Sequence, residues 1–232
     1  MKKLFFLLLV CIFFVPCLEV FAQSAELATT DLSQEEMKMI LQNIDITVVD
    51  HEGVKIPIEC FDVNDKEFIA IGGSDSINKT IYLYDKTQFV RGYTFKDNGS
   101  YGLEWNGENI QIHFVRGNIT VEINMNGEII SIRKIQDSLE NNSYWNDIIF
   151  AEKRTMNEKQ FFLDNDNIFA FSYSKLIMKE KDGTETIIYD ASNTYEAKTI
   201  ICVCGIFIFF CIIAIAIVKQ ILRKRKALMA LL

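Results

Sequence analysis

The chain has 232 residues, of which 50% are hydrophobic, and a net charge of −7. Seven of its 24 basic residues lie in the first 22 and last 14 positions, whereas only one of its 31 acidic residues does, so the central part is more acidic than the ends. Nucleic acids and anionic lipid surfaces are bound by clustered Lys and Arg, so this composition argues against both as partners of the central part.

The first 22 residues have the parts of a secretory signal peptide. Lys2 and Lys3 precede an apolar run from Leu4 to Val15, and the segment ends in a short small-residue site at Ala22. We therefore expect a signal peptide over residues 1–22 with cleavage after Ala22. An uncleaved N-terminal anchor, which would add a second membrane span, is the alternative.

Residues 23–43 are predicted to form a polar segment followed by a short helix. Ser33 and Glu36 have the spacing of a capping box, in which each side chain satisfies a backbone N–H of the other residue. We expect the helix to run from about Gln34 to Asn43.

Residues 44–190 alternate between apolar and polar side chains and are rich in Ile, Val, Tyr and Phe, which predicts an all-β ectodomain. Sequences typical of a hairpin recur along this part. Four of them are residues 46–58, 81–93, 121–132 and 175–189, and a second strand-turn-strand element precedes three of these, at 60–73, 102–114 and 161–173. The Asn126-Gly127 and Asp182-Gly183 pairs favour tight two-residue turns.

Two stretches, 60–95 and 101–135, resemble NHL-type β-propeller repeats in their order of strands and turns. The resemblance implies propeller-like blades of four antiparallel strands, about four in number if the leading half-repeat at 46–58 is counted. Closed propellers of that type usually have six blades. Because this chain has only about four such units, we expect either a four-bladed ring or an open stack. A β-sandwich or an irregular β-meander is the alternative fold.

Residues 199–218 contain no charged side chain, and twenty residues of helix match the roughly 30 Å hydrocarbon core of a bilayer. We expect one transmembrane helix there, reached through a linker at 191–198. The tail at 219–232 carries five basic residues and no acidic one, which places it in the cytoplasm and the β-rich part outside. The sequence therefore predicts a single-pass integral protein of the cell membrane.

Cys60 is the only cysteine between the predicted signal peptide and the predicted span, so the ectodomain cannot form an internal disulfide. It lies in an apolar run, and we expect it to be a small buried residue.

The sequence offers little for catalysis. His51 and His113 are the only histidines, and we expect no metal site, cofactor or nucleophile that depends on them. Two acidic segments, 62–67 and 164–167, have oxygen-bearing side chains at alternate positions but lack the glycine and distal glutamate of a calcium loop. We interpret them as ordinary turns, with a weak surface cation site as the alternative.

Aromatic residues dominate the energetic hot spots of protein interfaces. Five of them fall near expected strand ends and loops, where we expect them to be exposed and to contact a partner: Tyr93, Tyr101, Trp105, Tyr144 and Trp145. In the alternative interpretation, Trp105 and a further aromatic residue, Phe95, lie in the core between blades.

The Lys-, Asn- and Ile-rich composition favours a bacterial source. The leading hypothesis is a membrane-anchored, extracytoplasmic, non-catalytic module that binds a protein partner. An accessory subunit that acts through its transmembrane helix is the first alternative, and a metal-dependent hydrolase built on the acidic turns is a distant one.

Overall fold

The computed structural model describes residues 26–165, 172–194, 203–205, 207–213, 215 and 219. The predicted signal peptide, nine of the twenty residues of the predicted membrane span and all of the basic tail except Lys219 lie outside these residues. Within the described residues, no helix is both long enough and apolar enough to cross a membrane.

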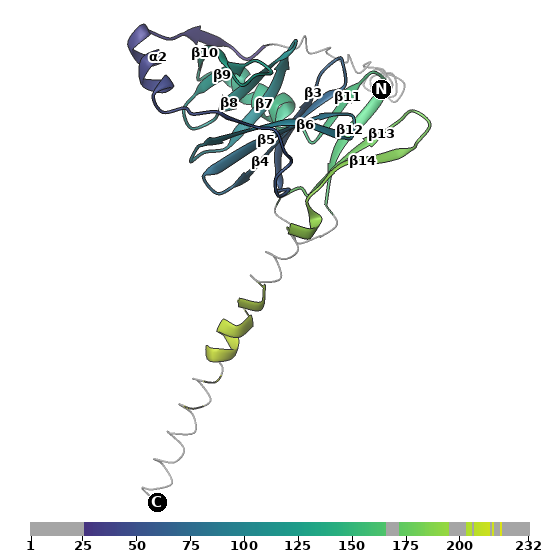
Figure 1. Ribbon diagram of the computed structural model, residues 1–232. Helices are drawn as coiled ribbons and strands as arrows, with labels where there is room; N and C mark the ends of the chain where they lie inside the picture. Colours follow the sequence, from purple (N-terminus) through teal and green to yellow (C-terminus); the bar gives the residue numbers. More distant parts are fainter. Residues whose placement is uncertain are drawn as a thin grey trace, which may run out of the picture.

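Three antiparallel sheets make up the β-rich part, and none closes into a barrel (Figure 1). Sheet A consists of β1 (Thr29–Asp31), β10 (Ile129–Ile135), β9 (Ile119–Ile123), β8 (Asn109–Phe114) and β7 (Tyr101–Asn106) in that order. Sheet B consists of β2 (Thr47–Val49), β6 (Gln88–Lys96), β5 (Asn78–Asp85), β4 (Phe68–Asp75) and β3 (Ile58–Val63). Sheet C consists of β11 (Lys153–Met156), β12 (Lys159–Asp164), β13 (Lys175–Lys179) and β14 (Glu185–Asp190).

Each sheet is built on four strands that follow one another in the chain, and β1 and β2 extend sheets A and B at an edge. The predicted repeats at 60–95 and 101–135 therefore correspond to the meanders β3 to β6 and β7 to β10. Hairpin turns are present at both predicted glycines, and Gly127 and Gly183 have positive φ angles of 79° and 90°. The predicted two-residue loops are wrong, because the N–H groups of the glycines donate to the backbone oxygens of Asn124 and Glu180, so that each loop holds three residues.

The expected hairpin at 46–58 is wrong. Its first half is β2, which pairs with β6, and its second half leads into β3, which pairs with β4 at the opposite edge of sheet B. The polar stretch between the two halves therefore runs from one edge of the sheet to the other instead of reversing on itself.

The third repeat is shifted relative to the prediction, and the described residues form three sheets instead of about four. The first hairpin of sheet C joins β11 to β12 through Asn157 and Glu158, both with positive φ, so it begins before the expected element at 161–173. The stretch at 136–159 that precedes this element holds helix α3 (Leu139–Tyr144), the π-helix η1 (Trp145–Ile149) and β11.

Sheet B is the middle layer of the β-rich part. One buried cluster joins its residues to sheet C through Phe61, Tyr84 and Phe161, and another joins it to sheet A through Leu83 and Leu103. Because both faces of sheet B are covered, successive residues of its strands are buried. Burial of apolar surface between three layers is the main source of stability for this arrangement.

Cys60 is buried in the cluster between sheets A and B, as predicted, with 2% of its surface exposed. Burial raises the pKa of its thiol well above the usual value. The thiol is therefore protonated at neutral pH and behaves as an apolar group.

A buried ion pair joins the three sheets where β3, β7 and β11 come together. Arg154 Nε of β11 lies 3.0 Å from Asp62 Oδ1 of β3, and the other oxygen of Asp62 accepts a 2.7 Å hydrogen bond from the backbone N–H of Trp105 in β7. Burial raises the pKa of Asp62, although Arg154 acts in the opposite direction. Asp62 is thus a buried strand residue, which corrects its assignment to an acidic turn.

Helix α2 (Gln34–Leu41) confirms the predicted short helix, and Ser33 and Glu36 form the full capping box. Helices α3 and η1 cover one end of the outer face of sheet A. Gly102 of β7 makes this possible, since a Cβ atom there would lie 2.0 Å from Ile149 Cγ2.

The described residues of the predicted span are helical at 203–205 and 207–213 and lie away from the three sheets (Figure 1). Their large apolar side chains are exposed, with Phe207 at 69% and Phe210 at 62%. The residues described in this stretch therefore present an apolar surface that no sheet of the protein covers.

Candidate functional site

The outer face of sheet A carries two rows of polar side chains that cross its strands. Strand alternation sends Leu103, Ile112 and Val121 toward sheet B, so their neighbours point the other way. The register places one row as Glu104, Gln111, Glu122 and Ser131, and the second as Gly102, His113, Thr120 and Arg133. These rows form the floor of a pocket of about 420 Å³, in the size range of small-molecule sites.

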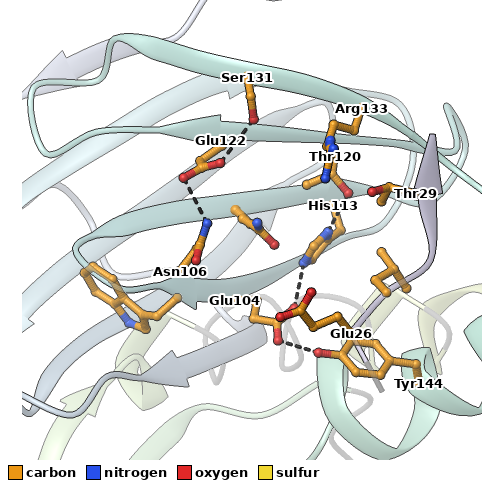
Figure 2. Close-up of a pocket in the computed structure, with 13 residues that line it drawn as sticks. Glu26, Thr29, Glu104, Asn106, His113, Thr120, Glu122, Ser131, Arg133 and Tyr144 are labelled. Atoms are coloured by element: carbon orange, nitrogen blue, oxygen red, sulfur yellow. Dashed lines mark hydrogen bonds and ion pairs between the residues drawn. The ribbon is translucent and has the colours of Figure 1, made fainter. Parts of the chain in front are cut away.

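His113 is the most deeply buried polar residue of this floor, with none of its surface exposed. Its Nδ1 lies 2.9 Å from Thr120 Oγ1, and its Nε2 lies 3.3 Å from Glu104 Oε2 (Figure 2). The approach to Glu104 lacks the geometry of a hydrogen bond, so Nε2 has no hydrogen-bond partner among the described residues. The ring of Trp145 packs edge-on against the imidazole, with the centroids 5.8 Å apart.

Glu104 is held by two neighbours on the pocket floor. Its carboxylate accepts a hydrogen bond from the Tyr144 hydroxyl and lies beside His113. Burial by itself would raise the pKa of Glu104, but the interactions with His113 and Tyr144 outweigh it and hold the pKa below its usual value. Glu104 is therefore ionised at neutral pH. The same contact works in reverse on Tyr144, whose pKa is raised by burial and by the adjacent carboxylate.

Glu122 accepts hydrogen bonds from three neutral donors and is held firmly. Asn106 Nδ2 lies 3.1 Å from its Oε1, and Ser131 Oγ lies 3.1 Å from its Oε2 (Figure 2). Asn109 Nδ2 lies 2.8 Å from the same Oε1. None of these donors carries a charge. The carboxylate thus keeps its negative charge uncompensated by a cation among the described residues.

Two further charged side chains complete the pocket wall. Arg133 lies 3.4 Å from Asp31, the last residue of β1, so its charge is already shared with a carboxylate. Glu26 lies just before β1 and makes no hydrogen bond or ion pair with the residues that the structure describes. The pocket therefore carries three carboxylates and one guanidinium that is paired with an acid outside the pocket lining.

The predicted partner-binding aromatics occupy different environments. Tyr93, Tyr101 and Tyr144 are buried, which corrects the expectation that they are exposed. Tyr93 donates to the backbone oxygen of Met125, and Tyr101 donates to that of Gly73. Their hydroxyl groups thus serve the interior, where a buried O–H needs an acceptor.

Phe95 is also buried, as the alternative for it predicted. Trp105 and Trp145 are the two predicted aromatics that stay partly exposed. Trp105 lines the pocket, and Trp145 covers His113. Only Trp105 of the two lines the pocket, while Trp145 reaches it indirectly through His113.

The first acidic segment that was compared with a calcium loop, 62–67, serves the fold, and the second, 164–167, lies partly outside the described residues. Asn64 Oδ1 accepts hydrogen bonds from the backbone N–H groups of Lys66 and Phe68, which is ordinary turn chemistry. In the described part of the chain, no three His, Cys, Asp or Glu side chains gather as they do around a metal ion.

No protein-family model matches this chain, and neither a curated protein nor a solved structure shows a significant match. What the pocket can do therefore follows from its own chemistry. It combines carboxylates held by hydrogen bonds, a buried imidazole and one indole ring on a sheet, which suits the recognition of a polar ligand.

Proposed function

We propose that this chain is a membrane-anchored binding module, with its β-sheets outside the cytoplasm and its C-terminus inside. The observation that carries the anchor is the exposed apolar surface of residues 203–205 and 207–213, among which Phe209 is 60% and Ile212 is 61% exposed. Contact of such a surface with water is unfavourable, whereas its contact with the hydrocarbon core of a bilayer is not. The charge-free stretch 199–218 that contains these residues has the length of one span.

The two ends of the sequence support the orientation. A basic segment follows the apolar stretch, and basic residues next to a span favour the cytoplasmic side. The N-terminal 22 residues have the pattern of a secretory signal, which would export the β-rich part. The acidic surface of this part fits an extracytoplasmic module that stays free of the anionic membrane surface.

Binding is favoured over catalysis by the accessibility of the pocket groups. Thr120, His113 and Glu104 form a hydroxyl, imidazole and carboxylate series that resembles a hydrolytic triad in its contacts. Thr120 is only 5% exposed and His113 is not exposed, so a substrate carbon cannot approach the hydroxyl in this arrangement. The outer carboxylates, in contrast, line the open cavity and can contact a ligand.

The anchor is tested by extraction of membranes from cells that express the full chain. Wild-type protein should stay in the pellet at alkaline pH, whereas a Phe209→Lys/Ile212→Lys double variant should shift to the soluble fraction, because each buried charge costs about 3 kcal/mol at the centre of a span. A Lys181→Glu variant, which changes an exposed charge on the β13–β14 turn, is the matched control. Extraction of the wild-type chain at alkaline pH would contradict the proposal.

A further inference from the structure

The charge of the sheet A pocket selects the sign of its ligand. Glu26, Glu104 and Glu122 contribute three carboxylates, and Arg133 is engaged by Asp31. The first carboxylate makes no ion pair with the described residues, and the third is held only by uncharged donors. A cation is therefore attracted to this cavity, and an anion is repelled.

The buried imidazole helps to keep Glu104 ionised. Nδ1 of His113 lies 2.9 Å from the Thr120 hydroxyl, and Nε2 lies 3.3 Å from Glu104 Oε2. Because this contact lowers the pKa of Glu104, Nε2 carries a proton that faces the carboxylate, and the Thr120 hydroxyl donates to Nδ1. Nε2 nevertheless makes no hydrogen bond with the described residues, so the Glu104 carboxylate can still accept a donor from the cavity.

We propose that the sheet A pocket binds an organic ammonium group, which donates hydrogen bonds to the carboxylates of Glu26 and Glu104. An alkylammonium carries three donors and no acceptor, which matches a floor rich in acceptors. Trp105 at the rim offers an aromatic face for the alkyl part or the charge. The inference rests on the proposed function as a binding module and specifies the ligand of that same module.

The protein contains its own reporter for this binding. It has two tryptophans: Trp105 lines the pocket, and Trp145 packs on His113, one of the pocket residues. The full chain in detergent micelles is titrated with 1,4-diaminobutane while tryptophan fluorescence is followed. We expect a saturable change with the diamine and none with 1,4-butanediol, which has the same carbon chain and no charge.

Matched variants separate specific binding from general charge attraction. Glu26→Gln and Glu104→Gln should each weaken diamine binding by about tenfold or more, the amount expected for one lost charge-assisted hydrogen bond. Glu158→Gln, on the exposed turn between β11 and β12, should leave it unchanged. Glu26 lies at the exposed entrance, so its variant remains informative if Glu104→Gln fails to fold.

The source of the ammonium group is settled by a second titration with a short peptide that contains one lysine, compared with the same peptide after lysine acetylation. Preference for the free diamine assigns a small amine, and preference for the lysine peptide assigns a lysine side chain of a protein partner; either result supports the inference. Absence of saturable binding by both probes, or equal affinity of wild-type protein and Glu26→Gln, would overturn it. Membrane extraction of the same samples reports separately on the anchored module.

Discussion

Asp62 shows how a single carboxylate can hold three sheets together. The residue is 7% exposed, and its side chain contacts Arg154 of sheet C and the backbone of Trp105 in sheet A. A buried ion pair adds little net stability when intact, because desolvation of both charges offsets their attraction. Loss of one partner, however, leaves the other charge buried and unpaired.

We therefore expect Asp62→Ala to lower the free energy of unfolding by about 3 kcal/mol or more. Urea unfolding of the full chain in detergent micelles, followed by circular dichroism, measures this change. Lys181→Ala removes an exposed ion pair with Glu158 and should leave the midpoint nearly unchanged. Equal midpoints for the two variants would show that the junction does not hold the sheets together.

The lowered pKa of Glu104 predicts that the protein loses stability at acidic pH. Its pKa in the folded protein lies below the usual 4.5, so the unfolded chain takes up a proton first as the pH falls. The stabilisation it provides is complete above about pH 4.5 and is lost as the pH falls through the lower folded pKa. Asp62 has the opposite effect on stability. Its pKa is raised above 3.8 in the folded state, so ionisation of Asp62 lowers the free energy of unfolding.

This pH effect is measured by urea unfolding between pH 3 and pH 7. Glu104→Gln should show a shallower decline below about pH 4.5 than wild-type protein, since the titrating carboxyl is gone. A Glu128→Gln variant, which changes a surface carboxylate outside the pocket, serves as the comparison. A decline as steep in Glu104→Gln as in the wild type would assign the acid sensitivity to other groups.

At the scale of elements, the helical insertion after β10 depends on the absence of a side chain in β7. A Cβ atom at position 102 would meet Ile149 at 2.0 Å, so Gly102→Ala should displace η1 from sheet A and cost about 1–3 kcal/mol. Displacement of η1 also moves Trp145 away from His113, which changes tryptophan fluorescence. Gly53→Ala is the control, because its Cβ would meet only the Tyr82 hydroxyl at 4.0 Å. Unchanged stability and fluorescence of Gly102→Ala would contradict this account.

Local patterns predicted the elements that are decided by neighbours in sequence. The capping box at Ser33, the alternation of apolar residues and the glycines at positions 127 and 183 all act over a few residues, and the structure confirms the helix and turns they indicated. The pairing of β2 with β6 could not be predicted in this way, because it joins residues more than forty positions apart. The choice between neighbouring strands is made by packing in the whole sheet.

The burial of the aromatic residues was missed for the same reason. Tyr93 and Tyr101 were expected near strand ends and therefore exposed. A second sheet covers them, and their hydroxyl groups donate hydrogen bonds to backbone oxygens. The pocket likewise unites residues from the first β-strand to helix α3, far apart in the chain. Its one sequence signal is the alternation of polar residues in β7, β8 and β9, opposite to the apolar residues that face sheet B.

At the scale of the whole molecule, we propose that a β-sheet stack recognises a ligand and that an apolar segment holds it at a membrane. The stack buries both faces of sheet B and leaves the polar outer face of sheet A open at the pocket. The helical residues 207–213 lie away from the stack (Figure 1), and their large apolar side chains are exposed. These two proposed roles agree with an acidic central part between two basic, apolar ends.

The most direct test of the central claim is protease treatment of intact bacterial spheroplasts that express the full chain with a C-terminal epitope tag. The account predicts that added protease degrades the β-sheet part while a short, membrane-bound fragment keeps the tag, because the tag lies in the cytoplasm and the sheets lie outside. Full protection of the chain until the spheroplasts are lysed, or loss of the tag before lysis, would contradict it.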